Sequence, residues 1–211
     1  MSSADTMTRS AESHLSVAHT ADALSALRAP DCPALIWRRR AAPAFQRWID
    51  ARPPETLPRV RTILRPDAVR TTLGDLFLAS GLPKGAERDT LLNEIAALSD
   101  AFAALMGARW LRLRLDVVTN NACRRFHTDA VTARLVCTFR GPGTQYGIAP
   151  DGHDPAEIRT VPTGDPILLR GTLWPTREET GFRHRSPPIE GSGKSRLVLV
   201  LDPIDDPGAE L

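Results

Sequence analysis

The chain has 211 residues, of which 42% are hydrophobic and 25% charged, and its formal net charge is +2 at pH 7. These values are typical of a folded globular domain and exclude a chain that is disordered throughout. The arginines are spread along the sequence instead of clustered, so nothing favours a nucleic-acid partner.

Targeting signals are not evident in the sequence. No apolar run is as long as a membrane span, and the N-terminal residues MSSADTMTRSAESHLSVAHT lack the basic and apolar regions of a secretory signal. We therefore expect a cytoplasmic protein with no membrane partner. The three cysteines, Cys32, Cys123 and Cys137, are odd in number and widely spaced, which predicts reduced thiols instead of a disulfide framework.

The N-terminal half predicts a mainly helical support region. Residues 1–18 contain few large apolar groups, so we expect a disordered tail followed by a single domain over 19–211. Within residues 19–108, the patterns predict helices at 21–29, 43–51, 66–80 and 86–106, and strands at 34–39 and 59–64. The firmest of these is the helix at 86–106, because apolar residues recur at intervals of four and three: Leu91, Ile95, Leu98, Phe102 and Leu105.

The C-terminal half changes to extended segments separated by turn residues. Residues 110–118, WLRLRLDVV, alternate strictly between apolar and charged side chains, as a half-buried strand does. Further strands are predicted at 132–139, 166–174 and 196–202, with a tight GPG turn at 141–143. We expect residues 109–205 to form a β core that carries the chemistry.

A histidine and an aspartate, His127 and Asp129, stand one residue apart before the strand predicted at 132–139. If this segment is extended, both side chains project to the same side. His184 is the other histidine of this half that lies beside polar partners in a strand-like context. Two histidines and one carboxylate form the facial triad typical of non-haem Fe(II) oxygenases, which leaves coordination positions open. His127, Asp129 and His184 are therefore candidate metal ligands and catalytic residues.

Arg196 follows His184 by twelve residues and begins the last predicted strand. If this strand returns antiparallel beside the one that ends near His184, the guanidinium lies near the metal and can bind a carboxylate through two hydrogen bonds. An anionic co-substrate would fit between the metal and this arginine.

Simpler interpretations of the same residues stay open. His127 and Asp129 would also form a local hydrogen-bonded pair, His184 would also be an exposed basic strand end, and Arg196 would also pair with a surface carboxylate. Cys123 is by type a small buried residue, but as a ligand beside the two histidines and the aspartate it would suit zinc.

The segments CRRFHTDAVTARLVCTFRGPGTQY and FRHRSPPIEGSGKSRLVLVLDP resemble those of the bacterial DUF1826 proteins, a family without an established activity, over roughly residues 30–205. The HxD, distal His and following Arg pattern resembles the Fe(II)/2-oxoglutarate-dependent dioxygenases. This resemblance implies a mostly β fold with helices, namely a double-stranded β-helix (a cupin-like jelly roll) with a helical N-terminal support.

The dioxygenase resemblance also implies site roles. His127, Asp129 and His184 would bind Fe(II), and Arg196 would bind the distal carboxylate of 2-oxoglutarate, which is decarboxylated to succinate while a C–H bond of an unknown substrate is oxidised. The charges of Fe(II), Asp129, 2-oxoglutarate and Arg196 sum to zero, which lowers the cost of burying them. Candidates for a second 2-oxoglutarate ligand are Arg114, Asn120, Asn121 and Tyr146.

Two further functions remain as alternatives to an oxygenase. The first is a zinc-binding protein for metal handling or sensing, which uses the same pocket without oxidation and with Cys123 as a further ligand. The second is a cupin-like module that binds a small carboxylate without catalysis. Arg196 favours the oxygenase, because a metal-handling site does not need a buried guanidinium.

Overall fold

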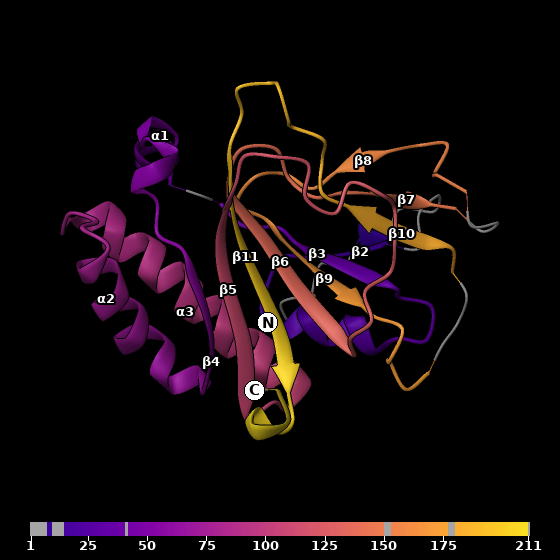
Figure 1. The fold of residues 1–211 in the computed structure, drawn as a ribbon. Coiled ribbons are helices and arrows are strands. Elements are labelled where there is room, and N and C mark those ends of the chain that lie inside the picture. The colour runs from indigo at the N-terminus through magenta and orange to yellow at the C-terminus, as the bar shows by residue number, and fades with distance from the viewer. Residues whose placement is uncertain (1–7, 10–14, 41, 150–152, 177–179, 211) are drawn as a thin grey trace, which may run out of the picture.

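The computed structural model describes residues 8–9, 15–40, 42–149, 153–176 and 180–210, and it combines helices with two β-sheets (Figure 1). The large sheet has the order β1-β2-β3-β9-β6-β11-β5-β4, and the small sheet has the order β10-β7-β8. Neighbouring strands are antiparallel except β2 and β3, which are parallel.

The strands of the large sheet, in chain order, are β1 (Thr8–Arg9), β2 (Leu15–Ala18), β3 (Ala34–Trp37), β4 (Val60–Leu64), β5 (Trp110–Val118), β6 (Ala133–Arg140), β9 (Pro166–Arg170) and β11 (Arg196–Ile204). The small sheet consists of β7 (Gln145–Ile148), β8 (Arg159–Thr160) and β10 (Phe182–Arg185). The α-helices are α1 (Pro43–Ala51), α2 (Val69–Ala79) and α3 (Ala86–Met106), and the 3-10 helices are η1 (Asp22–Arg28), η2 (Pro54–Thr56), η3 (Pro66–Ala68) and η4 (Pro207–Glu210).

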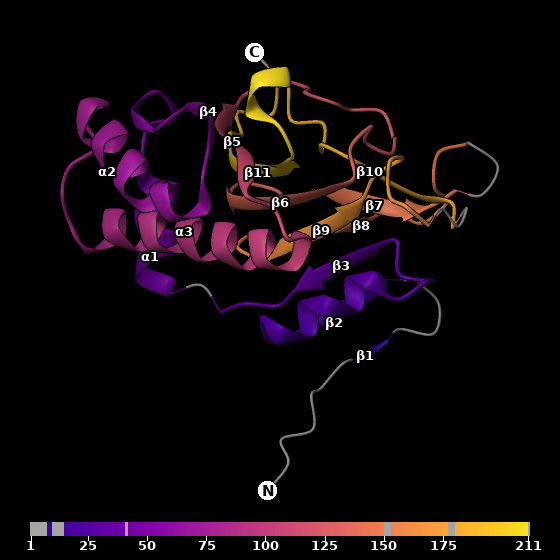
Figure 2. The same cartoon turned by 90° about the horizontal axis from the view of Figure 1, so that it is seen from below.

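Successive side chains of the central strands point to opposite faces of the large sheet, and each face packs against a different layer. On one face, Leu113 of β5 and Leu199 of β11 belong to the same buried cluster as Leu98 of α3. On the other face, Val136 and Val198 belong to a second buried cluster with Tyr146, Phe182, Ile167 and Leu169. The helices therefore cover one face and the small sheet covers part of the other, as Figures 1 and 2 show.

Helix α3 confirms the strongest sequence prediction. Its apolar stripe, Leu91, Ile95, Leu98, Phe102 and Leu105, is buried against the sheet. Glu87 and Asp89 lie in its first turn, where carboxylates favour the helix dipole. The helix ends at Gly107, which has a φ of 65°, a left-handed conformation that glycine adopts without the strain of a Cβ atom.

Several other elements confirm the sequence predictions closely. The helix at 43–51 and the strand at 110–118 have the predicted bounds, and strands lie within the predicted ranges 34–39 and 59–64. The predicted helix at 66–80 is a 3-10 turn followed by α2, and the one at 21–29 is the 3-10 helix η1. The strand predicted at 166–174 ends at Arg170.

The prediction of a tail over residues 1–18 is wrong at its C-terminal end. Leu15–Ala18 form β2, which pairs in parallel with β3, and its Leu15 and Ala18 are buried. The composition of the whole segment concealed this, because pairing with a neighbouring strand outweighs local polarity. Residues 1–7 and 10–14 lie outside the described residues. The N-terminal region also supplies β3 and β4 to the large sheet, so the fold is a mixed α/β arrangement and residues 19–108 do more than support a separate β core.

The described helices do not include one that is both long and apolar enough to cross a membrane.

The contact of α3 with the sheet gives a first test. Phe102 is fully buried, so Phe102→Ala should lower the free energy of unfolding by about 3 to 5 kcal/mol through lost burial and a cavity. Leu78→Ala on α2 is the control, because Leu78 is 55% exposed and its loss should change stability by less than about 0.5 kcal/mol. Denaturant unfolding followed by circular dichroism measures both. Equal effects of the two variants would contradict the placement of α3.

Candidate metal centre

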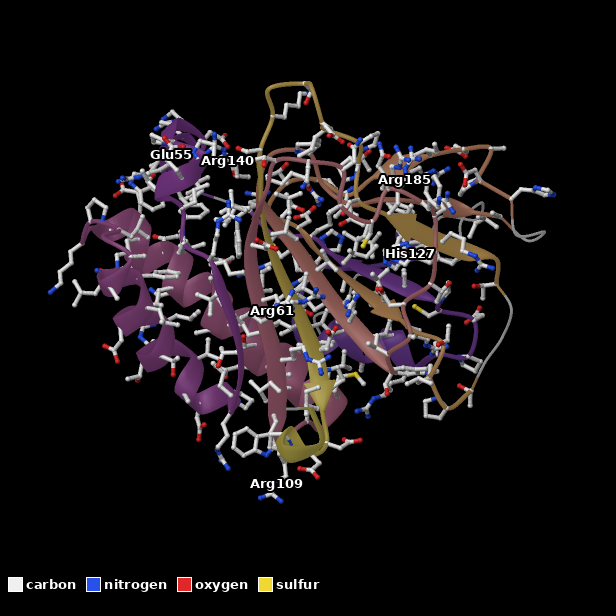
Figure 3. All side chains as sticks on the ribbon, in the orientation of Figure 1. Glu55, Arg61, Arg109, His127, Arg140 and Arg185 are labelled. Atoms are coloured by element: carbon white, nitrogen blue, oxygen red, sulfur yellow. The ribbon has the colours of Figure 1, made fainter. Side chains whose placement is uncertain are left out.

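The structure brings His127, Asp129 and His184 together (Figure 3 labels His127). One ligand atom of each lies within 4.8 Å of the others. His127 Nε2 is 3.4 Å from Asp129 Oδ1, and His184 Nε2 is 3.1 Å from Asp129 Oδ2. Donors that share one ion at about 2.1 Å lie about 3.0 to 3.4 Å apart, depending on whether the angle between them is octahedral or tetrahedral. The three side chains could therefore hold a metal ion.

Backbone hydrogen bonds hold the segments that carry these side chains. His127 and His184 form an isolated antiparallel bridge, in which each N–H donates to the other carbonyl at 3.0 Å. The N–H of Thr172 donates to the Asp129 carbonyl at 2.9 Å. Gly171 allows this close approach, because a Cβ atom there would lie 1.8 Å from the Val131 carbonyl oxygen.

The local structure of the HxD segment differs from the expected extended strand. Strand β6 begins only at Ala133, His127 belongs to the single bridge with His184, and Asp129 lies between that bridge and β6, outside any helix or strand. The two side chains meet because that bridge and the loop after β9 position them, and not because they alternate along one strand.

The imidazole of His127 has a defined orientation. Its Nδ1 lies 2.8 Å from the Arg125 carbonyl oxygen, which can only accept, so Nδ1 carries the proton and donates. In the neutral imidazole, Nε2 then has its lone pair directed toward Asp129 and His184, although the contact with Asp129 raises the pKa of His127. This second hydrogen bond is the arrangement that metal-binding histidines usually have.

Asp129 is held by an arginine that sequence analysis did not single out. Arg134 Nη1 donates to Asp129 Oδ1 at 2.6 Å, and its Nε and Nη2 donate to the two carboxylate oxygens of Asp202 at 2.6 and 2.8 Å. Oδ2 of Asp129 is buried, and apart from the contact with His184 Nε2 at 3.1 Å it accepts no hydrogen bond from the residues that the structure describes. With His184 neutral and its Nε2 binding a metal, this buried oxygen would have no donor, and a cation shared with His184 would satisfy it.

The electrostatics of this cluster favour an ionised carboxylate and a neutral buried histidine. Burial would raise the pKa of Asp129, but the contacts with His127 and His184 and the charge of Arg134 outweigh burial and hold this pKa far below its usual range. Burial lowers the pKa of His184, although Asp129 partly opposes this effect. A deprotonated carboxylate and a neutral imidazole are the forms that bind metals.

Arg196 lies in the same pocket as the three candidate ligands. Its side chain is 1% exposed, and it donates to the Pro142 carbonyl at 2.8 Å and to the hydroxyls of Ser186 and Thr138 at 3.1 Å. All three acceptors are neutral, and no carboxylate of the described residues forms an ion pair with it. Burial lowers the pKa of Arg196 to about 10. Three of its five N–H groups are used, which leaves two for a ligand.

The GPG turn helps to build the support of Arg196. Gly141 has a φ of 78°, and a Cβ atom there would lie 2.3 Å from the Ser195 carbonyl oxygen. Only glycine fits so close to the start of β11, and the following Pro142 carbonyl accepts from Arg196. The register of β6 and β11 also shifts between Leu197 and Val198, beside the hydrogen bond from Arg196 to Thr138.

The predicted strand neighbour of Arg196 is wrong. Strand β11 pairs with β5 and β6 in the large sheet, whereas His184 lies on β10 of the small sheet and β10 pairs with β7. Arg196 and His184 share the pocket because the two sheets lie against each other, not because their strands are hydrogen-bonded neighbours. The sequence distance of twelve residues suggested a hairpin, but the segment between them crosses from one sheet to the other.

The remaining candidates are placed differently. Cys123 is exposed and lines the pocket, but the group of residues close enough to share an ion does not include it. Of the four candidates for a second 2-oxoglutarate ligand, Arg114 lines the pocket. Asn121 instead accepts from the N–H groups of Ile189 and Glu190, and Tyr146 packs on Phe182 in the second core.

Arg134 and Asp202 are the residues that sequence reasoning missed. Each is a charged residue within or at the end of an otherwise apolar strand, ARLVCTFR or RLVLVLD, and the two charges have opposite sign. A buried charge needs a partner, so this pattern could have indicated a pair across β6 and β11.

The fold and site together define a strand-rich protein in which two sheets enclose a His/Asp/His cluster and a buried arginine. Residues 18–202 match the model of the family described as protein of unknown function (DUF1826), and the chain belongs to this family. Among the curated proteins, none matches the chain.

Several solved structures are similar to this one. The crystal structure of the rice dioxygenase for auxin oxidation is 14% identical, with 89% of this chain and 79% of that chain covered and a TM-score of 0.50, and this likeness concerns the fold. The 2-oxoglutarate complex of the Arabidopsis thaliana dioxygenase for auxin oxidation 1 is 11% identical, with coverages of 85% and 88% and a TM-score of 0.48. The hydroxypropylphosphonic acid epoxidase from S. wedmorenis is 14% identical, with coverages of 44% and 42% and a TM-score of 0.30.

Substitution of the candidate ligands tests the metal centre. Asp129→Ala and His127→Ala should each lower the affinity for Fe(II) at least a hundredfold while the circular dichroism spectrum stays unchanged, because a pocket between sheets does not depend on its ligand for folding. His153→Ala, at an exposed histidine, is the control and should leave affinity unchanged. Anaerobic calorimetric titration of the metal-free protein measures all three. Undiminished binding in either ligand variant would exclude this cluster as the site.

The cysteines give a second test of the ligand set. Cys123 is exposed, whereas Cys32 and Cys137 are buried and burial strongly raises the pKa of Cys137. One thiol per folded chain should therefore react rapidly with a disulfide reagent, and all three should react after unfolding. Because Cys123 lies outside the ligand group, it should stay reactive when the metal is bound. Protection of Cys123 by zinc would show that it is a ligand.

Proposed function

We propose that this protein is a non-haem Fe(II)/2-oxoglutarate-dependent oxygenase that oxidises an unknown substrate. Its two sheets would form a double-stranded β-helix. The observation that carries the proposal is the buried guanidinium of Arg196, which lacks a carboxylate partner among the described residues and shares one pocket with His127, Asp129 and His184. A site for metal alone has no need of this cation, but a site for metal and a dicarboxylate does.

In the proposed reaction, each residue has a defined task. His127 Nε2, His184 Nε2 and Asp129 Oδ2 would hold Fe(II), and Arg134 would keep Asp129 ionised and fixed. The two free N–H groups of Arg196 would bind the distal carboxylate of 2-oxoglutarate. When bound, the iron supplies the activation of dioxygen. 2-Oxoglutarate, dioxygen and a substrate C–H bond are converted to succinate, carbon dioxide and an alcohol, with one oxygen atom entering succinate and the other the alcohol.

Likeness to known proteins supports the fold of this proposal. The rice enzyme with the similar fold is a dioxygenase. At 14% identity, the likeness to the rice enzyme concerns fold alone, so the chemistry of this protein rests on its own pocket residues.

The second candidate function is a zinc-binding protein without oxidation. It is supported by Cys123, which is exposed and lines the same pocket, so that a modest movement of its loop would add sulfur to the donor set. This candidate gives Arg196 no role.

Anaerobic addition of Fe(II) and then 2-oxoglutarate to the metal-free protein tests the first candidate. We expect the weak visible charge-transfer band of the chelate. Arg196→Gln should weaken 2-oxoglutarate binding at least tenfold, because charge-assisted hydrogen bonds contribute about 1.5 to 3 kcal/mol each, and should leave Fe(II) affinity within twofold.

Arg88→Gln is the matched control for Arg196→Gln. Arg88 is also a buried arginine, but it donates to the Gly74 carbonyl in the helical layer, so 2-oxoglutarate binding should not change. Loss of both iron and 2-oxoglutarate binding in Arg196→Gln would mean that Arg196 is structural. Absence of the band, together with tight zinc binding that protects Cys123, would support the second candidate instead.

A further inference from the structure

A second arginine of the pocket, Arg114 on β5, also has no carboxylate partner among the residues that the structure describes. It is half-buried, and its Nε atom is buried without a hydrogen bond to any residue that the structure describes. Burial lowers the pKa of Arg114, and the positive charge of Arg134 lowers it further. A guanidinium in this position is costly unless an anion approaches it.

The neighbouring strand adds a second positive charge beside Arg114. Arg61 on the edge strand β4 pairs in register with Arg114, so the two side chains project from the same face of the sheet. Directly opposed like charges destabilise a sheet. In the large sheet β4 is the edge strand and β5 lies between it and β11, so Arg61 lies at the edge of this face.

The carboxylates around the pocket offset the charge environment of Arg114 only in part, because burial and the charges of Arg134 and Arg61 lower its pKa more than Asp202 and Asp129 raise it. Asp202 is occupied by Arg134, and the exposed Asp116 lies 3.4 Å from Arg59. Arg185, a further cation of the pocket, differs from Arg114, because it donates to Gln145 and lies over the ring of Phe126.

Arg114 is also separated from Arg196. Arg196 pairs with Val118, which lies four residues from Arg114 on the same strand, or about 13 Å along it. If Fe(II), Asp129, 2-oxoglutarate and Arg196 sum to zero charge and Arg134 neutralises Asp202, then Arg114 keeps a charge of +1 in the loaded pocket. This charge remains for the second substrate.

We propose that Arg114, assisted by Arg61, binds an oxyanion group, a carboxylate or a phosphate, of the molecule on which the site acts. The substrate is then an organic anion whose charged group lies over β5, while the carbon to be oxidised lies toward His127 and His184. As a statement about the substrate this rests on the proposed function, but binding of an anion by these two arginines does not depend on it.

The experiment uses the full chain loaded with Zn(II) and saturating 2-oxoglutarate, so that the Arg196 site is filled. The probes are phenylacetate, inorganic phosphate and the uncharged phenylacetamide, titrated by calorimetry. We expect at least one anion to bind and the amide not to bind, and the better of the two anions distinguishes a carboxylate site from a phosphate site. Arg114→Gln should weaken anion binding at least tenfold and leave 2-oxoglutarate binding within twofold.

Two further variants make the result specific. Arg61→Gln changes an exposed residue outside the core and should weaken anion binding about threefold even if Arg114→Gln folds poorly. Arg59→Gln removes the same net charge from a neighbouring arginine that already pairs with Asp116, and should change binding less than twofold. An equal loss in Arg59→Gln would overturn the proposal, because general electrostatic attraction would then explain the binding.

Other outcomes also overturn the proposal. The first is that neither anion binds, and the second is that phenylacetamide binds as tightly as the anions. The third is that Arg114→Gln lowers the affinity for 2-oxoglutarate instead of the affinity for the anion, which would make Arg114 a ligand of the co-substrate. The titration is repeated on protein without zinc and 2-oxoglutarate. Failure of the proposed function is seen separately, as absence of the visible band with Fe(II), and does not remove anion binding in this repeat.

Discussion

The arrangement of this protein depends on the burial of charge on one face of its large sheet. Strands β5, β6 and β11 present leucines to the helices on one face, but on the other face they carry Arg114, Arg134, Arg196 and Asp202. A buried charge without a partner costs several kcal/mol, so each of these groups is stable only if it pairs with an opposite charge of the chain or of a ligand. Which of them have partners within the chain decides what the pocket can bind.

Arg134 and Arg196 differ in this respect. The charge of Arg134 is compensated, because its guanidinium forms ion pairs with two carboxylates, those of Asp129 and Asp202. These contacts also fix the side chain of Asp129, a candidate metal ligand, against the large sheet. Arg196 is equally fixed in position, but its three acceptors are neutral oxygens that leave its charge in place. A guanidinium that is fixed in position but has no opposite charge beside it is suited to bind an anion, because its N–H donors lose little conformational entropy when the ligand binds.

The sequence predicted the elements whose pattern is local and missed those that depend on distant pairing. Helix α3 and strand β5 were predicted correctly because their apolar residues repeat at intervals of 3.6 and 2 along one segment. Strand β2 was assigned to a tail because only its pairing with β3 orders it. The candidate ligands could be named from residue types, but the bridge between His127 and His184, the passage of the chain from the small sheet to the large one, and the Arg134–Asp202 pair are tertiary features.

The number of metal-binding side chains distinguishes the two candidate functions more clearly than the residue types of these side chains do. Structural zinc sites are closed by four protein ligands, whereas this cluster has three within the described residues, and Cys123 lies outside it. Three ligands from the protein leave positions for exogenous donors, and the pocket beside them contains a cation suited to the far end of a dicarboxylate. A zinc sensor would need Cys123 to move inward and would leave Arg196 buried with its charge uncompensated. The proposed oxygenase would use both features as they stand, because the cost of burying the charge of Arg196 without a carboxylate would then be offset by binding 2-oxoglutarate.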